Sequence, residues 1–187
     1  MLKESFNYEI PVVIERNVVN FFKYNDNRQL TNIPIYLGTF EEEDKVSSSA
    51  SQALYFYGFP DLGNGYKFAI HHSLKIFKYH HEIDREIQPQ EEQRINKVFS
   101  KIFKDFNPNS ITITKRETCL YTISPDTNFI VDSLNDDKNL ICASPCSGHG
   151  FKFVSVIGKY IQEFIDNGRF IEDFGLKRFN PKLTPKL

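Results

Sequence analysis

The chain lacks an excess of charge of either sign. Its 187 residues include 23 Lys and Arg and 24 Asp and Glu, a formal net charge of -1 at pH 7. Nucleic acids and anionic membranes are bound by clustered basic residues, so neither partner is expected. No apolar run approaches the roughly 20 residues of a membrane-spanning helix, and the first ten residues have no apolar segment typical of secretory signals. These absences predict a soluble, cytoplasmic protein.

Cysteine and glycine motifs are also scarce. The chain has only three cysteines, Cys119, Cys142 and Cys146. They cannot form a disulfide framework, which favours a reducing compartment.

Residues 148–150, Gly-His-Gly, do not complete a dinucleotide-binding pattern, because Phe153 stands where the third glycine is needed. Internal repeats are absent, which excludes solenoids and propellers. The final Pro-Lys-Leu resembles the peroxisomal Ser-Lys-Leu signal weakly, so the peroxisome is the alternative compartment.

What is present is a series of β-branched and aromatic runs. The expected strands span residues 9–24, 31–40, 53–60, 65–72, 111–125, 128–134 and 139–145. Asn64 and Gly65 form a hairpin signal, which indicates an antiparallel sheet. The polar segment 41–52 predicts an exposed loop.

Two segments have helical periodicity. Residues 89–106 place apolar side chains at three- and four-residue steps behind an acidic first turn. A second helix is expected from 151 to 165, ended by Asn167 and Gly168. The tail, 169–187, is expected to pack as an extended strap. With 40% hydrophobic residues, the chain has enough apolar side chains for an α+β core.

Metal and thiol chemistry are both conceivable but weakly indicated. The side chains with suitable spacing for a metal are Cys142, Cys146 and His149, with His71, His72, His80 or His81 as a fourth ligand. Without a paired C-x-x-C motif, a cysteine at a strand end more often fills apolar space, and no metal is expected. Cys119 could be a nucleophile, but its neighbours carry no catalytic-cysteine signature.

Two lysines lie in aromatic surroundings. Lys67 is in the strand 65–72, and Lys152 lies between Phe151 and Phe153. Each could simply reach solvent. However, an amine among aromatic rings is costly to bury unless it meets a carboxylate, so Lys152 is a candidate anion-binding group. The glycines just before it would let the backbone approach a flat or charged group at a helix start.

Several segments together resemble one family. ETCLYTISPDTNFIVD followed by SGHGFKF resembles the carboxy-terminal half of the monomeric sarcosine oxidase family. This family includes N-methyltryptophan oxidase and pipecolate oxidase, FAD enzymes of the D-amino-acid-oxidase-like superfamily. IPVVIERNVVNFF, which contains Arg16, and YGFPDLGNGYKFAIHH resemble upstream strands of the same family. The resemblance covers residues 10 to about 165, with Pro145 and Cys146 where the family usually has glycine and phenylalanine.

The resemblance implies a role for each candidate residue. Cys119 would attach FAD covalently through its 8α-methyl group, and Lys67 would lie over the flavin and activate oxygen. Lys152 would bind the substrate carboxylate. The turn against the isoalloxazine ring would be Gly148, His149 and Gly150. The amine pocket would be lined by Tyr57, His71 and Tyr121.

The implied reaction is oxidation of a secondary or N-methyl amino acid to an imine, with oxygen reduced to hydrogen peroxide. Residues 1–110 would belong to the substrate domain, and 111–187 would be the carboxy-terminal portion of the FAD-binding domain. The family's amino-terminal Rossmann half, with its G-x-G-x-x-G turn, is not found in the chain. We therefore expect a fragment that pairs with a separate Rossmann half or dimerises through exposed apolar surface. The alternative is a non-catalytic remnant or pairing module.

Overall fold

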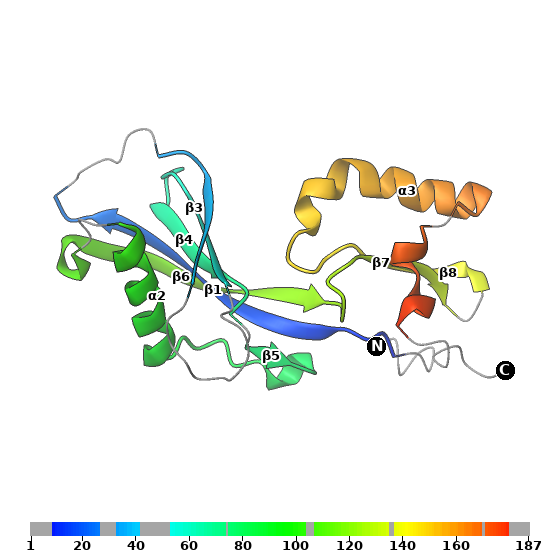
Figure 1. The fold of residues 1–187 in the computed structure, drawn as a ribbon, viewed down its shortest axis with the longest axis horizontal. Helices are drawn as coiled ribbons and strands as arrows, with labels where there is room; N and C mark the ends of the chain where they lie inside the picture. Colours follow the sequence, from blue (N-terminus) through cyan, green and yellow to red (C-terminus); the bar gives the residue numbers. More distant parts are fainter. Residues whose placement is uncertain are drawn as a thin grey trace. The chain divides into compact units, whose positions relative to one another are not determined.

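The computed structural model describes residues 9–26, 33–41, 53–73, 75–103, 107–134, 137–169 and 171–179 (Figure 1). The chain forms two compact units. Unit 1 comprises Met1–Ile14, Ile76–His80 and Tyr121–Leu187. Unit 2 comprises Glu15–Lys75 and His81–Leu120. In the part of the chain that is described, no helix has the length and hydropathy needed to span a membrane.

A six-stranded sheet contributes most of its residues to unit 2, and only β5 and short ends of β1 and β6 belong to unit 1. Its strands are β1 (Val13–Tyr24), β2 (Tyr36–Glu41), β3 (Ala53–Phe59), β4 (Tyr66–His71), β5 (Ile76–Phe77) and β6 (Ile111–Ile123). The strand order is β2-β3-β4-β1-β5, and β6 also pairs with β1. The turn between β3 and β4 is closed by Asp61, whose carboxylate accepts hydrogen bonds from the backbone N–H groups of Gly63 and Gly65 at 2.7 and 2.8 Å.

One face of this sheet is covered by α2 (Pro89–Ile102). Because side chains alternate along a strand, every second residue of β4 enters the core: Tyr66, Phe68 and Ile70. The ring of Phe99, from α2, lies edge-on at 5.0 Å from Phe68 and 4.8 Å from Phe22. This aromatic contact joins the helix to the two central strands.

A buried ion pair joins the start of α2 to β1. Arg16 is fully buried, and its guanidinium donates to the carboxylate of Glu91 and to the backbone carbonyl of Glu86. Glu91 also accepts a hydrogen bond from the backbone N–H of Gln88 and so completes a capping box. Partial burial raises the pKa of Glu91, but the hydrogen bonds from Arg16 and from the backbone of Gln88, together with the nearby positive charges of Arg16 and Lys75, bring the pKa below its usual value.

Unit 1 contains a two-stranded sheet and a helix. β7 (Ile130–Leu134) pairs antiparallel with β8 (Asp137–Ser144), and the helix is α3 (Val154–Asn167). Short 3-10 helices are η3 (Gly150–Phe153), η4 (Glu172–Phe174) and η5 (Leu176–Arg178). Leu176 of η5 packs with Ile130 and Leu134 to form a small core.

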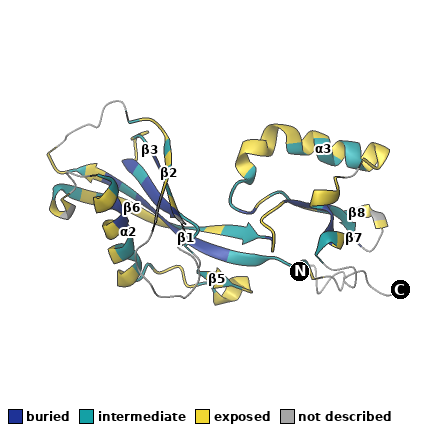
Figure 2. Ribbon diagram, in the orientation of Figure 1, coloured by how far each residue is buried: buried dark blue, intermediate teal, exposed yellow. Residues whose placement is uncertain are grey.

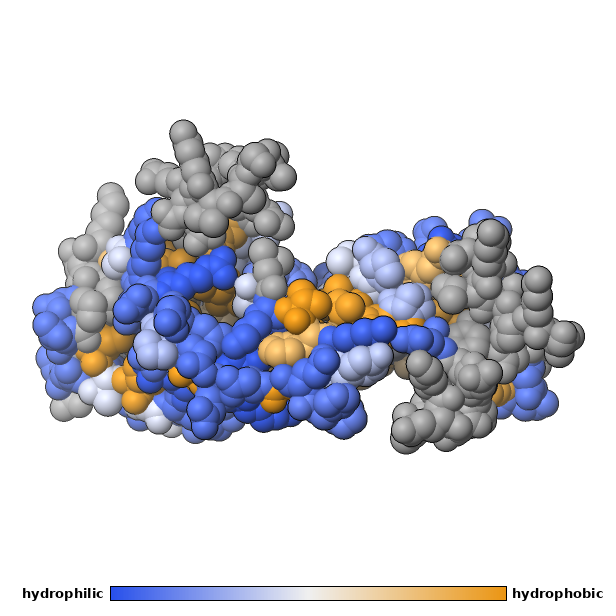
Figure 3. Space-filling view, turned by 90° about the horizontal axis from the view of Figure 1, so that it is seen from below, coloured by the Kyte–Doolittle hydropathy of each residue, from blue (hydrophilic) through white to orange (hydrophobic). Residues whose placement is uncertain are grey.

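The α+β class, the antiparallel sheet and the two long helices are confirmed. The first helix is shorter than predicted, because Phe103 is extended and α2 ends at Ile102, whereas residues 104–106 lie outside the described part. The predicted loop 41–52 also lies outside it after Glu41. The extended strap is wrong for residues 171–179, which form η4 and η5. Figure 3 shows a surface that is largely hydrophilic, with hydrophobic residues in small groups between the polar ones.

The buried ion pair leads to a stability prediction. Glu91→Gln should lower the free energy of unfolding by about 3 kcal/mol, because it leaves the Arg16 charge buried without a counter-charge. The measurement is urea denaturation followed by circular dichroism. Glu92→Gln is the matched control, since Glu92 pairs with Arg116 at 3.0 Å in a more exposed position and should change stability by less than about 1 kcal/mol. Equal effects of the two substitutions would contradict the prediction.

Candidate functional site

The sheet face of unit 2 opposite α2 carries three of the candidate residues. Lys67 and His71 alternate with the core residues of β4, and Tyr57 of β3 pairs in register with Ala69 between them. The Lys67 ammonium lies 5.4 Å from the ring centroid of Tyr57 and 5.1 Å from that of Phe59. The rings of Tyr57 and His71 are nearly perpendicular at 6.1 Å. The structure therefore brings Lys67, Tyr57 and His71 together.

Lys67 is half-buried, and among the described residues it forms no ion pair. Its ammonium lies over the rings of Tyr57 and Phe59 instead, and the quadrupole of an aromatic ring attracts a cation. Such a cation remains available to a negatively charged group that approaches this face.

Cys119 of β6 lies on the same face by strand alternation. The ammonium of Lys115 is 5.9 Å from the ring of Phe21, which pairs in register with Lys67. Arg116, in contrast, bonds to Asn20 and to Glu92 of α2, so it points to the core face. Residues 115, 117 and 119 alternate with it, which puts the half-buried thiol of Cys119 on the face that carries Lys67.

In unit 1, the turn 147–150 packs against Tyr121 and Thr122, the part of β6 that belongs to the same unit. The backbone N–H of Ser147 donates to the carbonyl of Thr122 at 2.8 Å. Gly148 has φ +77°, and a Cβ there would lie 2.7 Å from the ring of Tyr121. At Gly150 a Cβ would lie 1.7 Å from the carbonyl oxygen of Pro145. The structure thus joins Tyr121 to the glycine turn, and both glycines are required by contacts within the chain itself.

His149 is held by the loop before β7. Its ring stacks on Phe129 at 5.0 Å, and Nε2 lies 3.0 Å from the carbonyl oxygen of Thr127. Lys152, in η3, is exposed, with its ammonium 5.4 Å from the ring of Phe153. The aromatic burial that the sequence suggested for Lys152 is therefore absent within unit 1, where the lysine reaches solvent as its position on a first helical turn allows.

An ion pair fixes the same loop to the end of the described chain. Arg178 donates to both carboxylate oxygens of Asp126, at 2.7 and 3.1 Å, and to the carbonyl of Phe129 at 2.9 Å. The Arg178 hydrogen bond lowers the pKa of Asp126 to about 2. This long-range contact was missed at the sequence level, because nothing local links residue 126 to residue 178.

The cysteines differ in environment. Cys142 packs against the small core of unit 1, and burial, followed by the charge of Asp132, raises its pKa to about 11. Cys146 is exposed. Within the described ranges, no three His, Cys, Asp or Glu side chains gather closely enough to hold a metal ion.

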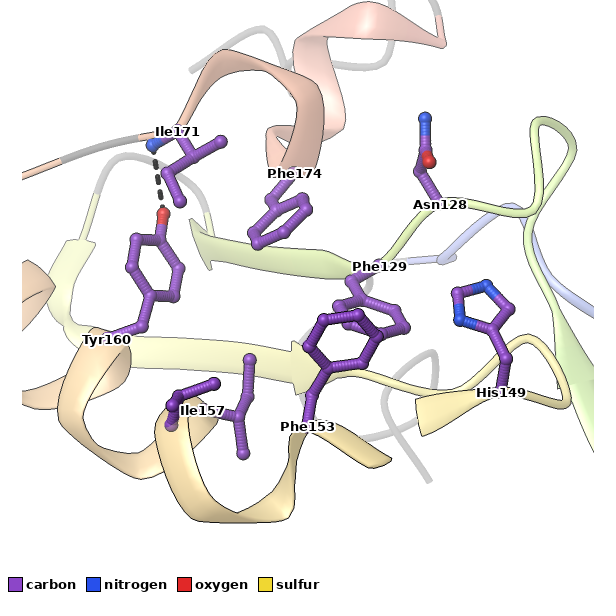
Figure 4. A pocket seen from close by; sticks show the side chains of 9 residues that line it. Asn128, Phe129, His149, Phe153, Ile157, Tyr160, Ile171 and Phe174 are labelled. Carbon is purple, nitrogen blue, oxygen red and sulfur yellow. Dashed lines mark hydrogen bonds between the residues drawn. The ribbon is translucent and has the colours of Figure 1, made fainter. Parts of the chain in front are cut away.

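An apolar pocket of about 330 Å³ lies between α3 and η4 of unit 1 (Figure 4). Its lining residues are Asn128, Phe129, His149, Phe153, Val156, Ile157, Tyr160, Ile171 and Phe174. The Tyr160 hydroxyl accepts a hydrogen bond from the backbone N–H of Ile171 at 2.9 Å. None of the described lining residues is a lysine, an arginine or a carboxylate, so these residues do not suit a charged amino acid. The scattered aromatic residues of the tail were the only sequence signal for it.

Comparison with known proteins identifies the family to which the chain belongs. The model of the family described as "FAD dependent oxidoreductase" matches residues 27–164. The chain belongs to the FAD-dependent oxidoreductase family. Among its relatives, monomeric sarcosine oxidase of Bacillus sp. (strain NS-129) is 28% identical over 96% of the chain. That of Arthrobacter sp. (strain TE1826) is 31% identical over 99%. N-methyl-L-tryptophan oxidase of Yersinia pestis (strain Pestoides F) is 31% identical over 66% of the chain and 33% of its own length.

The fold of the chain is also found in a solved structure. A mutant of NikD, an unusual amino acid oxidase essential for nikkomycin biosynthesis, matches 90% of the chain with a TM-score of 0.60 and 12% identity. The chain spans 44% and 45% of the length of the two sarcosine oxidases and 42% of the NikD chain. The resemblance to a carboxy-terminal portion of such oxidases is thereby confirmed.

The Asp126–Arg178 pair predicts a pH-dependent contribution to stability. The carboxyl pKa is about 2 in the folded chain and roughly 3.9 when unfolded, so the pair stabilises the fold above pH ~4 and this contribution is lost as the pH falls through about 2. Because the Asp126 carboxylate is partly exposed and screened by water, Arg178→Gln should lower the free energy of unfolding by only about 1 kcal/mol at pH 7. Urea denaturation at several pH values should show this difference shrinking below pH ~4. The control is Arg169→Gln, because Arg169 forms an exposed pair with Glu163; a difference for Arg178→Gln that is constant with pH would refute the account.

The raised pKa of Cys142 predicts unequal thiol reactivity. In a Cys119→Ser background at pH 8, Ellman's reagent should modify the exposed Cys146 quickly and Cys142 about 100-fold more slowly, because little Cys142 thiolate is present. In concentrated urea the two rates should become similar. Two fast phases in the folded protein would show that Cys142 is accessible and ionised.

Proposed function

We propose that this chain is the carboxy-terminal part of a flavin-dependent oxidase that converts a secondary or N-methyl amino acid to an imine. Oxygen would be the electron acceptor and hydrogen peroxide the reduced product. The observation that carries the proposal is the Lys67 ammonium, which has aromatic neighbours and no acidic partner among the described residues. The similarity to enzymes named monomeric sarcosine oxidase supplies the substrate class.

The residues of unit 2 fit a flavin on the sheet face opposite α2. A half-buried thiol at Cys119 and a cation at Lys67 share that face, as argued from the Lys115 and Phe21 contact. When bound, FAD would accept a hydride equivalent from the amine and pass two electrons to oxygen. Cys119 would hold the cofactor through a thioether.

Lys67 would act on oxygen. Its ammonium would stabilise the negative charge that develops as oxygen is reduced, and the edge-to-face rings of Tyr57 and Phe59 would keep the cation in place without neutralising it. Tyr57 and His71 would shape the space for the amine beside it.

Unit 1 would contribute the glycine turn and Lys152. The turn of Gly148, His149 and Gly150 is preorganised by Tyr121, Phe129 and Pro145, so its backbone would meet the flavin without rearrangement. The exposed ammonium of Lys152 would pair with the substrate carboxylate.

Reconstitution tests the proposal. We would co-express the chain with the amino-terminal portion of Arthrobacter sarcosine oxidase that precedes the matched region and measure the visible spectrum, acid-stable flavin and peroxide formation from sarcosine. We expect a yellow complex whose flavin stays attached after acid precipitation. Cys119→Ser should abolish attachment, whereas Cys146→Ser, at an exposed cysteine, should not. Lys67→Met should slow reoxidation by oxygen about 100-fold with flavin still attached.

A non-catalytic pairing module is the second candidate. It is favoured by one fact, that the chain spans less than half the length of the sarcosine oxidases it matches. A complex that forms but never acquires flavin would support this candidate and overturn the oxidase proposal.

A further inference from the structure

A buried carboxylate in unit 2 has no role in the chemistry proposed above. The middle of β1 is buried (Figure 2), and Glu15 on this strand is only 2% exposed. Its neighbour Arg16 points to α2. Alternation along β1 therefore puts Glu15 on the opposite face of the sheet, which also carries Lys67. A carboxylate is costly to bury unless it is hydrogen-bonded, so the contacts of Glu15 are informative about its role.

The imidazole of His72, directly after β4, is paired with this carboxylate. Nδ1 of His72 lies 2.7 Å from Oε2 of Glu15. An ionised carboxylate can only accept a hydrogen bond, so Nδ1 carries the hydrogen. Because Glu15 is buried and His72 is partly exposed, a group inside the fold holds a ring that lies near the surface.

The backbone at His72 is held in an uncommon conformation. Its φ is +65°, in the left-handed region that residues with a side chain adopt rarely. Ser73 fixes this turn, since its backbone N–H donates to Oδ1 of Asn17 at 2.8 Å and its hydroxyl donates to the carbonyl of Arg16. The guanidinium of Arg94 donates to the carbonyl of Ser73 at 3.3 Å. Contacts from β1 and α2 thus determine where the side chain of His72 lies.

This turn brings the rings of two consecutive histidines together. In a regular strand, neighbouring side chains point to opposite faces. The ring centroids of His71 and His72 are nevertheless only 4.1 Å apart, with their planes at 53°. His71 also lies nearly perpendicular to the ring of Tyr57 at 6.1 Å. A continuous series of contacts therefore runs from Glu15 through the two imidazoles to Tyr57 at the candidate site.

We propose that Glu15 and His72 are positioning residues that fix the imidazole of His71 at the amine site. This inference rests on the proposed function, in which Tyr57 and His71 shape the space for the amine. Glu15 fixes the ring of His72, and that ring in turn limits the orientations open to His71. Such support matters at an active site, because a displacement of about 1 Å can slow a reaction about 100-fold.

A bond that only joined β1 to β4 would not need the imidazole ring. Ser73 already makes that connection through Asn17 and Arg16. The contact between the rings of His71 and His72 is additional to it. The ring of His72, rather than its hydrogen bond alone, is therefore the feature that separates a positioning role from a connection between strands.

Two substitutions separate the hydrogen bond from the ring contact. His72→Asn keeps a donor for Glu15 and a residue that tolerates a positive φ, but it removes the ring. Glu15→Gln keeps an acceptor for Nδ1–H and removes the charge, whereas Glu15→Leu removes the acceptor. His81→Ala is the matched control, because His81 is an exposed histidine of the same unit.

The first measurement uses the full chain alone. NMR couplings between Hα and Hβ of His71 report whether one χ1 rotamer or several are populated. We expect a single rotamer in the wild type, in Glu15→Gln and in His81→Ala. In His72→Asn and Glu15→Leu the couplings should be averaged over several rotamers. If Glu15→Leu does not fold, His72→Asn carries the same test.

The second measurement uses the complex with the amino-terminal portion of Arthrobacter sarcosine oxidase. Stopped-flow absorbance separates flavin reduction by sarcosine from reoxidation by oxygen. His72→Asn and Glu15→Leu should slow reduction at limiting sarcosine by about 10-fold or more, with reoxidation, which depends on Lys67, within about two-fold of the wild type. Glu15→Gln should restore most of the rate of reduction. A general distortion of unit 2 would slow both steps.

Three results would overturn the proposal. The first is averaged couplings of His71 in the wild type, and the second is a single rotamer of His71 in both His72→Asn and Glu15→Leu. The third is an equal loss of flavin reduction and reoxidation in these variants. A complex that never acquires flavin would overturn the proposed function and with it the amine site, whereas the rotamers of His71 would still decide whether Glu15 and His72 hold its ring.

Discussion

Side-chain alternation in β4 is the constraint on which the candidate site depends. Tyr66 and Phe68 must face α2, because their rings build the core of unit 2 with Phe99. Lys67 is therefore forced to the opposite face, and a shift of the strand by one residue would bury the ammonium instead. The same packing that stabilises the sheet thus places a cation, which forms no ion pair with any described residue, on a surface lined by aromatic rings. The apolar core of unit 2 and the position of Lys67 outside it both follow from the register of β4.

The buried pair of Arg16 and Glu91 keeps that register in place. β1 lies beside β4, with Phe21 opposite Lys67, and Arg16 anchors β1 to the first turn of α2. A buried ion pair contributes little net stability compared with apolar residues of the same size, but it strongly disfavours arrangements in which either charge loses its partner. Its main effect here is to select one position of the helix on the sheet, which suits a site that needs fixed geometry.

The features that could be predicted from the sequence are those determined by residues close together in the chain. The strands and the start of α2 could be predicted from the sequence, since alternation, the acidic first turn and Pro89 act within a few residues. The helical turns of the tail could not, because Arg178 is positioned by Asp126, far away in the chain. Among the site residues, alternation along β4 was sufficient to predict that Lys67 is outside the core. For Lys152 the sequence left two interpretations open, a solvated lysine on a first helical turn and an anion-binding amine among aromatic rings, and the structure shows an exposed side chain because only packing could decide between them.

The glycines of unit 1 differ in whether contacts within the chain explain them. Gly148 and Gly150 are explained by the chain itself, because a side chain at either would strike Tyr121 or Pro145, so their presence is no evidence for a ligand. Gly158 costs helix stability, and the described chain receives nothing in return. A residue that breaks a local rule without an internal compensation is most informative about what lies outside. On this criterion the two glycines of the turn are explained by the fold, whereas no described residue explains the glycine in the middle of α3.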